Sequence, residues 1–259
     1  MSIETGEIRK LKIGPLKLEV YPTRDTAGAA AAHAAALEMK ALAAANETVS
    51  IVFATGMSQV EMFAALTAIP GLPWEQVSGF HLDDYIGVSD AHLASPRRYI
   101  REKLTQRVPM REFREIEGTA TDPAVTAQRY AEALRAANPQ LCLLGIGENG
   151  HLAFNDPADG IFDEERDVKT VDLSEETRAQ LAAERRFKAP EEVATQAITL
   201  SVPAIFRIPT LIVTVPGPRK ARAIRRTLYD AVSTQCPSTI LRTHPDVRIY
   251  IDETAAAEI

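Results

Sequence analysis

A short apolar run that ends in a glycine-rich polar turn is the feature that most constrains the fold. Four apolar residues, Leu141–Leu144, predict a short strand that is buried on both faces. Gly145, Gly147 and Gly150 follow directly, and the same turn carries His151 beside amide and carboxylate side chains. Open α/β sheets place ligand sites outside the carboxyl ends of their strands, where glycines let the backbone approach a ligand closely. We therefore expect this turn to form part of a ligand site.

Predicted strands and helices alternate along the whole chain, which has 259 residues. The expected strands are 17–21, 49–54, 77–82, 141–144, 168–173, 197–202, 210–215 and 247–251, and the expected helices are 29–45, 58–68, 95–107, 121–136, 174–186 and 217–229. The first helix should begin near Thr23 or Asp25. Such alternation predicts an α/β fold, a single-domain open, mainly parallel sheet with helices on both faces. Without a linker or an internal repeat, residues 1–259 are expected to form one domain.

Composition excludes several classes of partner. The net charge is −6 and the basic residues are scattered, which argues against nucleic acid. No apolar run approaches the roughly 20 residues of a membrane span. Only Cys142 and Cys236 are present, so neither a disulfide framework nor a zinc site is indicated. The polar N-terminus has no apolar core of a signal peptide, and we expect a cytoplasmic protein.

Two further turns have the composition of anion sites. Residues 55–58, Thr-Gly-Met-Ser, follow a predicted strand and begin a helix, where free backbone N–H groups attract anions. Residues 217–220, Gly-Pro-Arg-Lys, place cations at a helix start, which the helix dipole disfavours unless a phosphate binds there. The alternatives are an ordinary helix cap in the first turn and a solvated basic pair in the second.

Two adjacent carboxylates, Asp83 and Asp84, follow the strand predicted at residues 77–82. One of them is suited to act as a general base, because repulsion from its neighbour raises its pKa. Adjacent acids are also common in turns and caps. A metal site made of His81 with these two acids lacks the usual ligand spacing, so we expect no metal.

A dinucleotide site is the alternative for the glycine-rich turn, since its three glycines match G-x-G-x-x-G. That fingerprint requires a helix that opens within it and an acidic residue roughly 20 residues later. Pro157 stops any such helix early, so the match lacks its context.

Taken together, these segments resemble the glucosamine-6-phosphate deaminase/isomerase family, which is related to the 6-phosphogluconolactonases. The likeness extends from about Val49 to Asp252. Its specific parts are residues 55–58, 80–87 (Phe-His-Leu-Asp-Asp-Tyr-Ile-Gly), 145–157, 168–170 (Val-Lys-Thr), 217–221 and 244–245 (His-Pro). The predicted sheet is accordingly of the Rossmann-like type.

The resemblance implies the conversion of glucosamine 6-phosphate to fructose 6-phosphate and ammonia, with no cofactor and with a small sugar phosphate as the partner. It implies that Asp83 takes the C2 proton of the opened sugar and delivers it to C1. It implies that His151 opens the ring by passing a proton between the ring oxygen and O1. A single carboxylate between C2 and C1 is able to both remove and return the proton. A homo-oligomer is compatible with this family.

The substrate-binding residues expected from these motifs are Thr55, Gly56, Met57, Ser58, Asp84, Tyr85, Gly147, Gly150, Arg186 and Lys220. Arg186 matches the family's phosphate-binding arginine only loosely, and Arg178 or Arg185 are the alternatives.

The turn departs from the best-known family members around its histidine. Asn149 stands where they have an aspartate, Glu148 precedes it, and Asp156 replaces a glutamate. Those acids orient and polarise the histidine in the family, so the catalytic set expected here is Asp83, His151, Glu148, Asn149 and Asp156.

The departures leave three alternative functions open. One is a deaminase/isomerase that acts on a different amino-sugar phosphate. Another is a hydrolase of the 6-phosphogluconolactonase type, although its usual Gly-His-Thr-Ala-Ser and Asp-Glu-Arg wordings are absent here. The third is a non-catalytic sugar-phosphate sensor.

Overall fold

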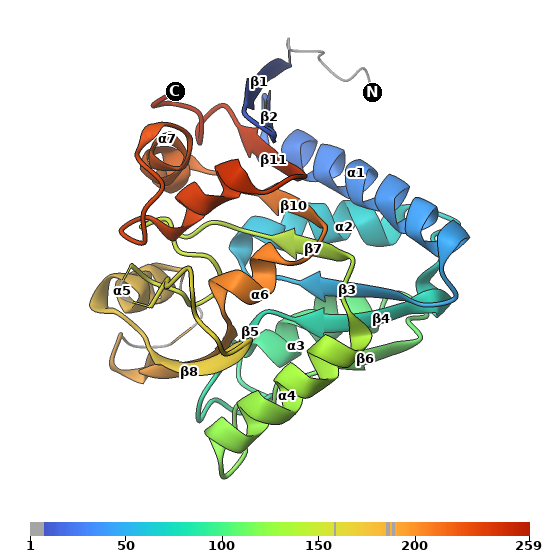
Figure 1. Ribbon diagram of the computed structural model, residues 1–259, viewed down its shortest axis with the longest axis vertical. Coiled ribbons are helices and arrows are strands. Elements are labelled where there is room, and N and C mark those ends of the chain that lie inside the picture. Colours follow the sequence, from blue (N-terminus) through green and yellow to red (C-terminus); the bar gives the residue numbers. More distant parts are fainter. Residues whose placement is uncertain (1–7, 158, 185–186, 188–189) are drawn as a thin grey trace.

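The computed structural model describes residues 8–157, 159–184, 187 and 190–259. Within them, the main sheet has eight strands in the order β1-β2-β11-β10-β7-β3-β4-β6 (Figure 1). The bounds are β1 Arg9–Ile13, β2 Leu16–Tyr21, β3 Val49–Phe53, β4 Val77–His81, β6 Glu112–Arg114, β7 Leu141–Leu144, β10 Thr210–Thr214 and β11 Val247–Asp252. Every neighbouring pair is parallel except β1 and β2, which form an antiparallel hairpin at one edge.

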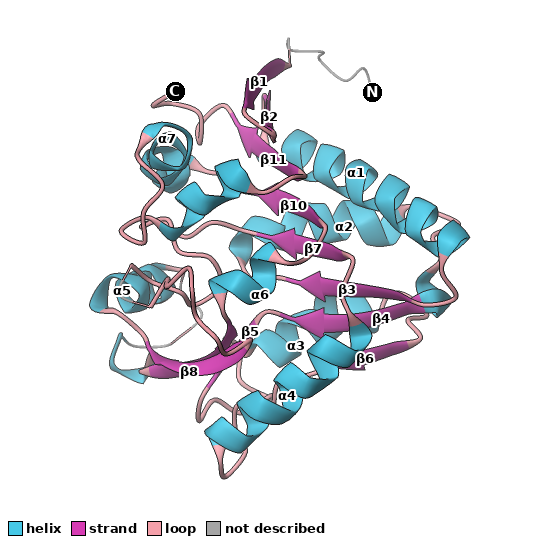
Figure 2. Cartoon of the chain, in the orientation of Figure 1, coloured by secondary structure: helices cyan, strands magenta, loops and turns pink. Residues whose placement is uncertain are grey.

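Successive side chains of the apolar strands belong alternately to two separate hydrophobic cores, one on each face of the sheet. Leu141 and Leu143 of β7 belong to a core with helices α1 and α2, whereas Cys142 and Leu144 belong to a core with α4, α6 and α7. Successive residues of a strand point to opposite faces, so a continuous apolar run is what a sheet covered on both sides requires. The predicted open, mainly parallel sheet with helices on both faces is confirmed (Figure 2).

Five of the seven α-helices in the described residues begin at a side-chain cap that the sequence supplies. Their bounds are α1 Arg24–Ala45, α2 Val60–Ala68, α3 Pro96–Ile100, α4 Pro123–Ala137, α5 Glu175–Ala183, α6 Val202–Phe206 and α7 Ala221–Tyr229. Thr23 caps α1 in a reciprocal capping box with Thr26, which confirms that this helix starts near Thr23. Ser174 caps α5 by accepting a hydrogen bond from the Thr177 N–H group.

The strands predicted at 168–173 and 197–202 do not join the parallel sheet. They form β8 (Val168–Asp172) and β9 (Gln196–Leu200), which pair antiparallel with each other and with β5 (Asp83–Tyr85) in a second sheet. Leu82 is the crossing point: its N–H donates to Phe53 O of the main sheet, and its carbonyl accepts from Leu200 N of β9. The chain after β4 therefore passes from one sheet into the other, which alternation alone did not predict.

Two short edge strands, β1 and β6, were also missed. Both carry mostly charged residues that stay exposed or half-exposed, so they lack the apolar signal of a buried strand. In the described part of the chain, no helix is long and apolar enough to span a membrane.

Close packing of α1 on α2 depends on Gly28. A Cβ atom there would lie 2.7 Å from Glu61 Cβ and 2.9 Å from Met62 N. We expect Gly28→Val to destabilise the protein by about 1–3 kcal/mol, the typical cost of overpacking. Ala29→Val on the exposed side of α1 should cost about 0.5 kcal/mol, from helix propensity alone. Urea unfolding of both variants checks the prediction, and equal losses would contradict it.

Candidate active site

The carboxyl ends of β3, β4 and β7 point toward α5 and the second sheet (Figure 1). A pocket of about 670 Å³, open at its mouth to solvent, lies at this edge. Its wall includes nine of the predicted site residues: Thr55, Gly56, Met57, Ser58, Asp83, Tyr85, Gly147, His151 and Lys220. Motifs separated by up to 165 residues in sequence are thus brought to one place, as expected for the carboxyl edge of a parallel sheet.

The turn at residues 55–58 is fixed from two sides. Tyr99 donates a hydrogen bond to the carbonyl oxygen of Gly56 at 3.0 Å. The buried amide of Gln59 donates to Leu144 O at 3.1 Å, and so ties the turn to the end of β7. A short 3₁₀ turn, Met57–Gln59, precedes α2. The backbone N–H groups and hydroxyls of this turn form one wall of the pocket.

Lys220 reaches the pocket from the turn between β10 and α7. Gly217 has a φ of 103°, which favours glycine, and its N–H donates to Asp252 Oδ1 at 2.9 Å. Burial lowers the pKa of Lys220, although the charges of Glu148 and Glu184 act in the opposite direction. Its neighbour Arg219 instead makes an ion pair with Glu148, with 2.9 Å between Nε and Oε1.

Asp83 lies on the pocket wall and is 7% exposed. Burial raises its pKa to about 8, and repulsion from Asp84 adds to the rise. The predicted effect of the neighbouring acid is therefore present, but desolvation is the larger cause.

Asp84 is not brought to the pocket. Its Oδ2 lies 2.9 Å from Arg97 Nε and accepts a hydrogen bond from the Gly118 N–H at 3.0 Å. Consecutive residues of β5 point to opposite faces, so only one of the two acids is able to face the cavity. Asp84 is thus an internal ion-pair partner rather than a substrate-binding group.

His81, the histidine of the metal site considered in the sequence, is also directed away from the pocket. His81 is fully buried, and its Nε2 accepts a hydrogen bond from Ile116 N at 2.5 Å. Burial, with a smaller contribution from Arg97, lowers its pKa to about 3. Across the residues that the structure describes, no group of three or more His, Cys, Asp or Glu side chains is placed to hold a metal ion.

His151 is held by a compact set of hydrogen bonds. Its Nδ1 lies 3.2 Å from Asp156 Oδ1, and its backbone N–H donates to Asn149 Oδ1 at 3.0 Å. Asn149 Nδ2 and Thr177 Oγ1 donate to the same Asp156 oxygen at 2.8 and 2.7 Å. A Cβ atom at Gly147 would lie 2.2 Å from the imidazole, so the ring occupies space that only glycine leaves open.

Asp156 remains ionised within this set. Burial alone would raise its pKa, but the hydrogen bond and charge of His151, together with the hydrogen bonds from Asn149 and Thr177, lower it well below its usual range. A carboxylate on Nδ1 fixes the orientation of the ring and leaves Nε2 for proton transfer.

The remaining predicted residues divide by location. Glu148 makes an ion pair with Arg219, its charge acts on Lys220, and its backbone N–H donates to Gln180 Oε1. Gly150 packs against Cys236, where a Cβ atom would lie 2.4 Å from Sγ. Arg178 approaches the Val193 carbonyl oxygen rather than the pocket. Arg186 and Arg185 lie outside the described residues.

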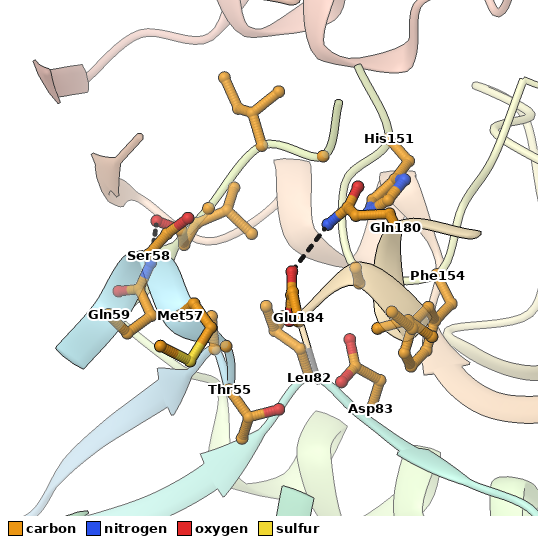
Figure 3. Close-up of a pocket in the computed structure, with 18 of the residues that line it drawn as sticks. Thr55, Met57, Ser58, Gln59, Leu82, Asp83, His151, Phe154, Gln180 and Glu184 are labelled. Atoms are coloured by element: carbon orange, nitrogen blue, oxygen red, sulfur yellow. Dashed lines mark hydrogen bonds between the residues drawn. The ribbon is translucent and has the colours of Figure 1, made fainter. Parts of the chain in front are cut away.

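Four polar residues in or beside the pocket were missed: Gln59, Thr177, Gln180 and Glu184. Thr177 and Gln180 lie on α5 and Glu184 is its C-cap residue, and their spacing of three and four residues places them on one side of the helix. Figure 3 shows Gln180 and Glu184 in the pocket. The sequence signal existed, since residues 174–186 were predicted as a charged helix, but nothing in that helix marked which face meets the site.

Chemically, the pocket combines an anion-binding wall with two proton-transfer groups. Helix N-terminal N–H groups and Lys220 suit a phosphate. Asp83, whose pKa lies near neutrality, suits a general base, and His151 backed by Asp156 suits proton exchange between oxygens.

The chain is similar in sequence to proteins of one known family. The family described as "Glucosamine-6-phosphate isomerases/6-phosphogluconolactonase" matches residues 22–249. A glucosamine-6-phosphate deaminase of an Exiguobacterium species is 35% identical over 206 residues, which are 79% of this chain and 78% of the relative. The corresponding protein of Bacillus thuringiensis is 33% identical over 211 residues, which are 81% and 78% of the two chains.

Solved structures share the architecture. A monomeric glucosamine-6-phosphate deaminase superimposes with a TM-score of 0.86 and 25% identity, over 93% of this chain and 99% of the other. A 6-phosphogluconolactonase from Thermotoga maritima superimposes with a TM-score of 0.73 and 18% identity, over 92% and 98% of the two chains. The second likeness concerns the fold.

The raised pKa of Asp83 has a consequence for stability. An acid with a higher pKa in the folded state favours folding less as the pH rises from its unfolded pKa, roughly 4, to its folded pKa. Because that folded value is about 8, Asp83→Asn should be more stable than the wild type at pH 8 and above, with a higher Tm. The difference should shrink toward pH 4.

Thermal unfolding of both proteins between pH 5 and pH 9 measures this difference. Asp163→Asn, at an exposed position, is the matched control, and its Tm difference from the wild type should not vary with pH. A Tm difference for Asp83→Asn that does not vary with pH would contradict the analysis.

Proposed function

Because the chain belongs to the glucosamine-6-phosphate isomerase/6-phosphogluconolactonase family, we propose that it is an aldose–ketose isomerase/deaminase. It converts glucosamine 6-phosphate and water to fructose 6-phosphate and ammonia. The observation that carries the proposal is that Asp83 and His151 line one pocket with two anion-binding turns. The relatives above 30% identity are glucosamine-6-phosphate deaminases, which favours this reaction over lactone hydrolysis.

Ring opening is assigned to His151. Its imidazole moves a proton from O1 to the ring oxygen, and the C1–O5 bond breaks to give the open-chain aldehyde. Asp156 keeps Nδ1 occupied at 3.2 Å, so that the other ring nitrogen faces the sugar.

The isomerisation is assigned to Asp83. The C1 carbonyl acidifies the C2–H, and Asp83 accepts this proton and returns it to C1. In the same rearrangement the nitrogen loses one proton and O1 gains one, which yields the C2 imine with a hydroxyl group at C1. Water adds to the imine and ammonia leaves, so the last step is hydrolytic. Burial favours this chemistry, because a desolvated carboxylate with a raised pKa is a stronger base.

The phosphate is assigned to the turn at residues 55–58 and to Lys220. Both lie on the pocket wall, and a bound dianion would favour the charged form of this half-buried lysine. We also propose that residues 1–259 form one cytoplasmic catalytic domain whose partner is the sugar phosphate.

The direct test is the release of ammonia and fructose 6-phosphate from glucosamine 6-phosphate. Galactosamine 6-phosphate, N-acetylglucosamine 6-phosphate and 6-phosphogluconolactone are assayed alongside. We expect turnover of the glucosamine compound without an added cofactor. Turnover of the lactone alone would replace the proposal with a hydrolase, and phosphate-dependent binding without any turnover would support a sensor.

Asp83→Asn separates chemistry from binding. The amide is unable to accept the C2 proton, so we expect kcat to fall by roughly 10²–10⁴-fold while the affinity for the sugar phosphate changes little. In the wild type, kcat/KM should rise with pH and level off above about pH 8, because Asp83 must be ionised to act as the base. An ascending limb centred below pH 6 would contradict this assignment.

A further inference from the structure

Helix α5 presents a polar face to the pocket that the proposed reaction does not yet use. Gln180 and Glu184 both line the cavity, and Figure 3 shows Gln180 near His151 and the Glu184 carboxylate in the same pocket as Asp83. Thr177, one turn earlier on the same face, contacts Asp156. The inward face of α5 therefore runs from the His151 group to the cavity itself.

Gln180 fixes the position of the Glu184 carboxylate. Its Oε1 accepts a hydrogen bond from the Glu148 N–H at 3.1 Å, so its amide group faces the other way. Its Nε2 then donates to Glu184 Oε1 at 3.2 Å, the bond drawn as a dashed line in Figure 3. The histidine turn thus positions a carboxylate in the pocket through one intervening amide.

A carboxylate at this place is unfavourable for a ligand that is only an anion. Among the described residues that line the pocket, Lys220 is the one lysine or arginine, and Glu184 interacts with its charge. A sugar phosphate brings two negative charges, which Glu184 repels. A cation on the ligand close to Glu184 offsets this repulsion.

The amine of an amino sugar is such a cation. Asp83 must lie beside C1 and C2 to transfer the proton, and the amine is attached to C2. Glu184 lines the same cavity as Asp83. An ammonium group held between them makes a charge-assisted hydrogen bond that a hydroxyl or an acetamide does not make.

We propose that Glu184 binds the C2 ammonium group of the substrate and that Gln180 is its positioning residue. The pocket thereby selects 2-amino-2-deoxy sugar phosphates over sugar phosphates with a neutral group at C2. This assignment rests on the proposed function, since it places C2 beside Asp83.

The test compares two open-chain analogues that differ only at C2: 2-amino-2-deoxyglucitol 6-phosphate and glucitol 6-phosphate. Calorimetry gives the ratio of their Kd values for the wild type, Glu184→Gln and Glu176→Gln. The last variant changes an exposed glutamate of the same helix and is the matched control. We expect the wild type to prefer the amino analogue and Glu184→Gln to lose roughly 10–100-fold of that preference, whereas the control keeps it.

Gln180→Met provides a second variant for the positioning role. This variant should reduce the preference for the amino analogue, measured as the ratio of the two Kd values. Its affinity for glucitol 6-phosphate should stay within about twofold of the wild type, because the phosphate-binding turns are unchanged. A loss of affinity for both analogues would indicate a structural role and would overturn the positioning assignment.

Two results would overturn the Glu184 assignment. If Glu184→Gln binds both analogues more tightly by the same factor, Glu184 only repels the phosphate. If its ratio equals that of the wild type, Glu184 does not contact the amine. Failure of the proposed function gives a different result: the wild type would bind neither analogue more tightly than inorganic phosphate, which would overturn both proposals.

Discussion

The burial of Asp83 at the junction of the two sheets is the constraint on which the site depends. Leu82 bonds to β3 on one side and to β9 on the other, so the next residue is held between them. Burying two consecutive acids is costly, and the structure offsets this cost for Asp84 with Arg97 and the Gly118 N–H. Burial raises the pKa of both acids, but Arg97 and the Gly118 N–H counteract the rise for Asp84, whose pKa is about 7, whereas Asp83 has no such partner among the described residues and reaches about 8. One carboxylate is neutralised within the protein while its neighbour is left for the ligand.

The second acid–base group, His151 with Asp156, depends on the amide side chain of Asn149. Asn149 accepts a hydrogen bond from the His151 backbone and donates one to Asp156. An aspartate at position 149 would place a second negative charge near Asp156 and would have no proton to donate. The Asn149–Asp156 pair therefore gives His151 one carboxylate partner. Asn149, which replaces the aspartate of the best-known relatives, is therefore compatible with an oriented His151. Glu148 instead forms the ion pair with Arg219.

Sequence reasoning located the parts of the site that follow directly after buried strands. The turns that contain Gly56, Gly147 and Lys220 were found because apolar runs ending in glycines have few other structural uses. It failed where tertiary geometry decides the outcome. The residue types alone do not distinguish Asp83 from Asp84: only the family resemblance singled out Asp83 for proton transfer, and the alternation of β5 determines which of the two meets the cavity. The inward face of α5 was equally hidden, because a polar helix face next to a pocket has the same composition as a solvated one.

Three residues from two segments of the chain meet at a single oxygen atom, Asp156 Oδ1. It is contacted by Asn149 and His151 from the turn after β7, and by Thr177 from α5. If α5 opened by itself, it would remove one of these donors from a buried carboxylate, which is costly. The helix and the histidine turn should therefore unfold locally as one cooperative unit, and their slow amide protons should exchange with solvent with similar free energies of opening.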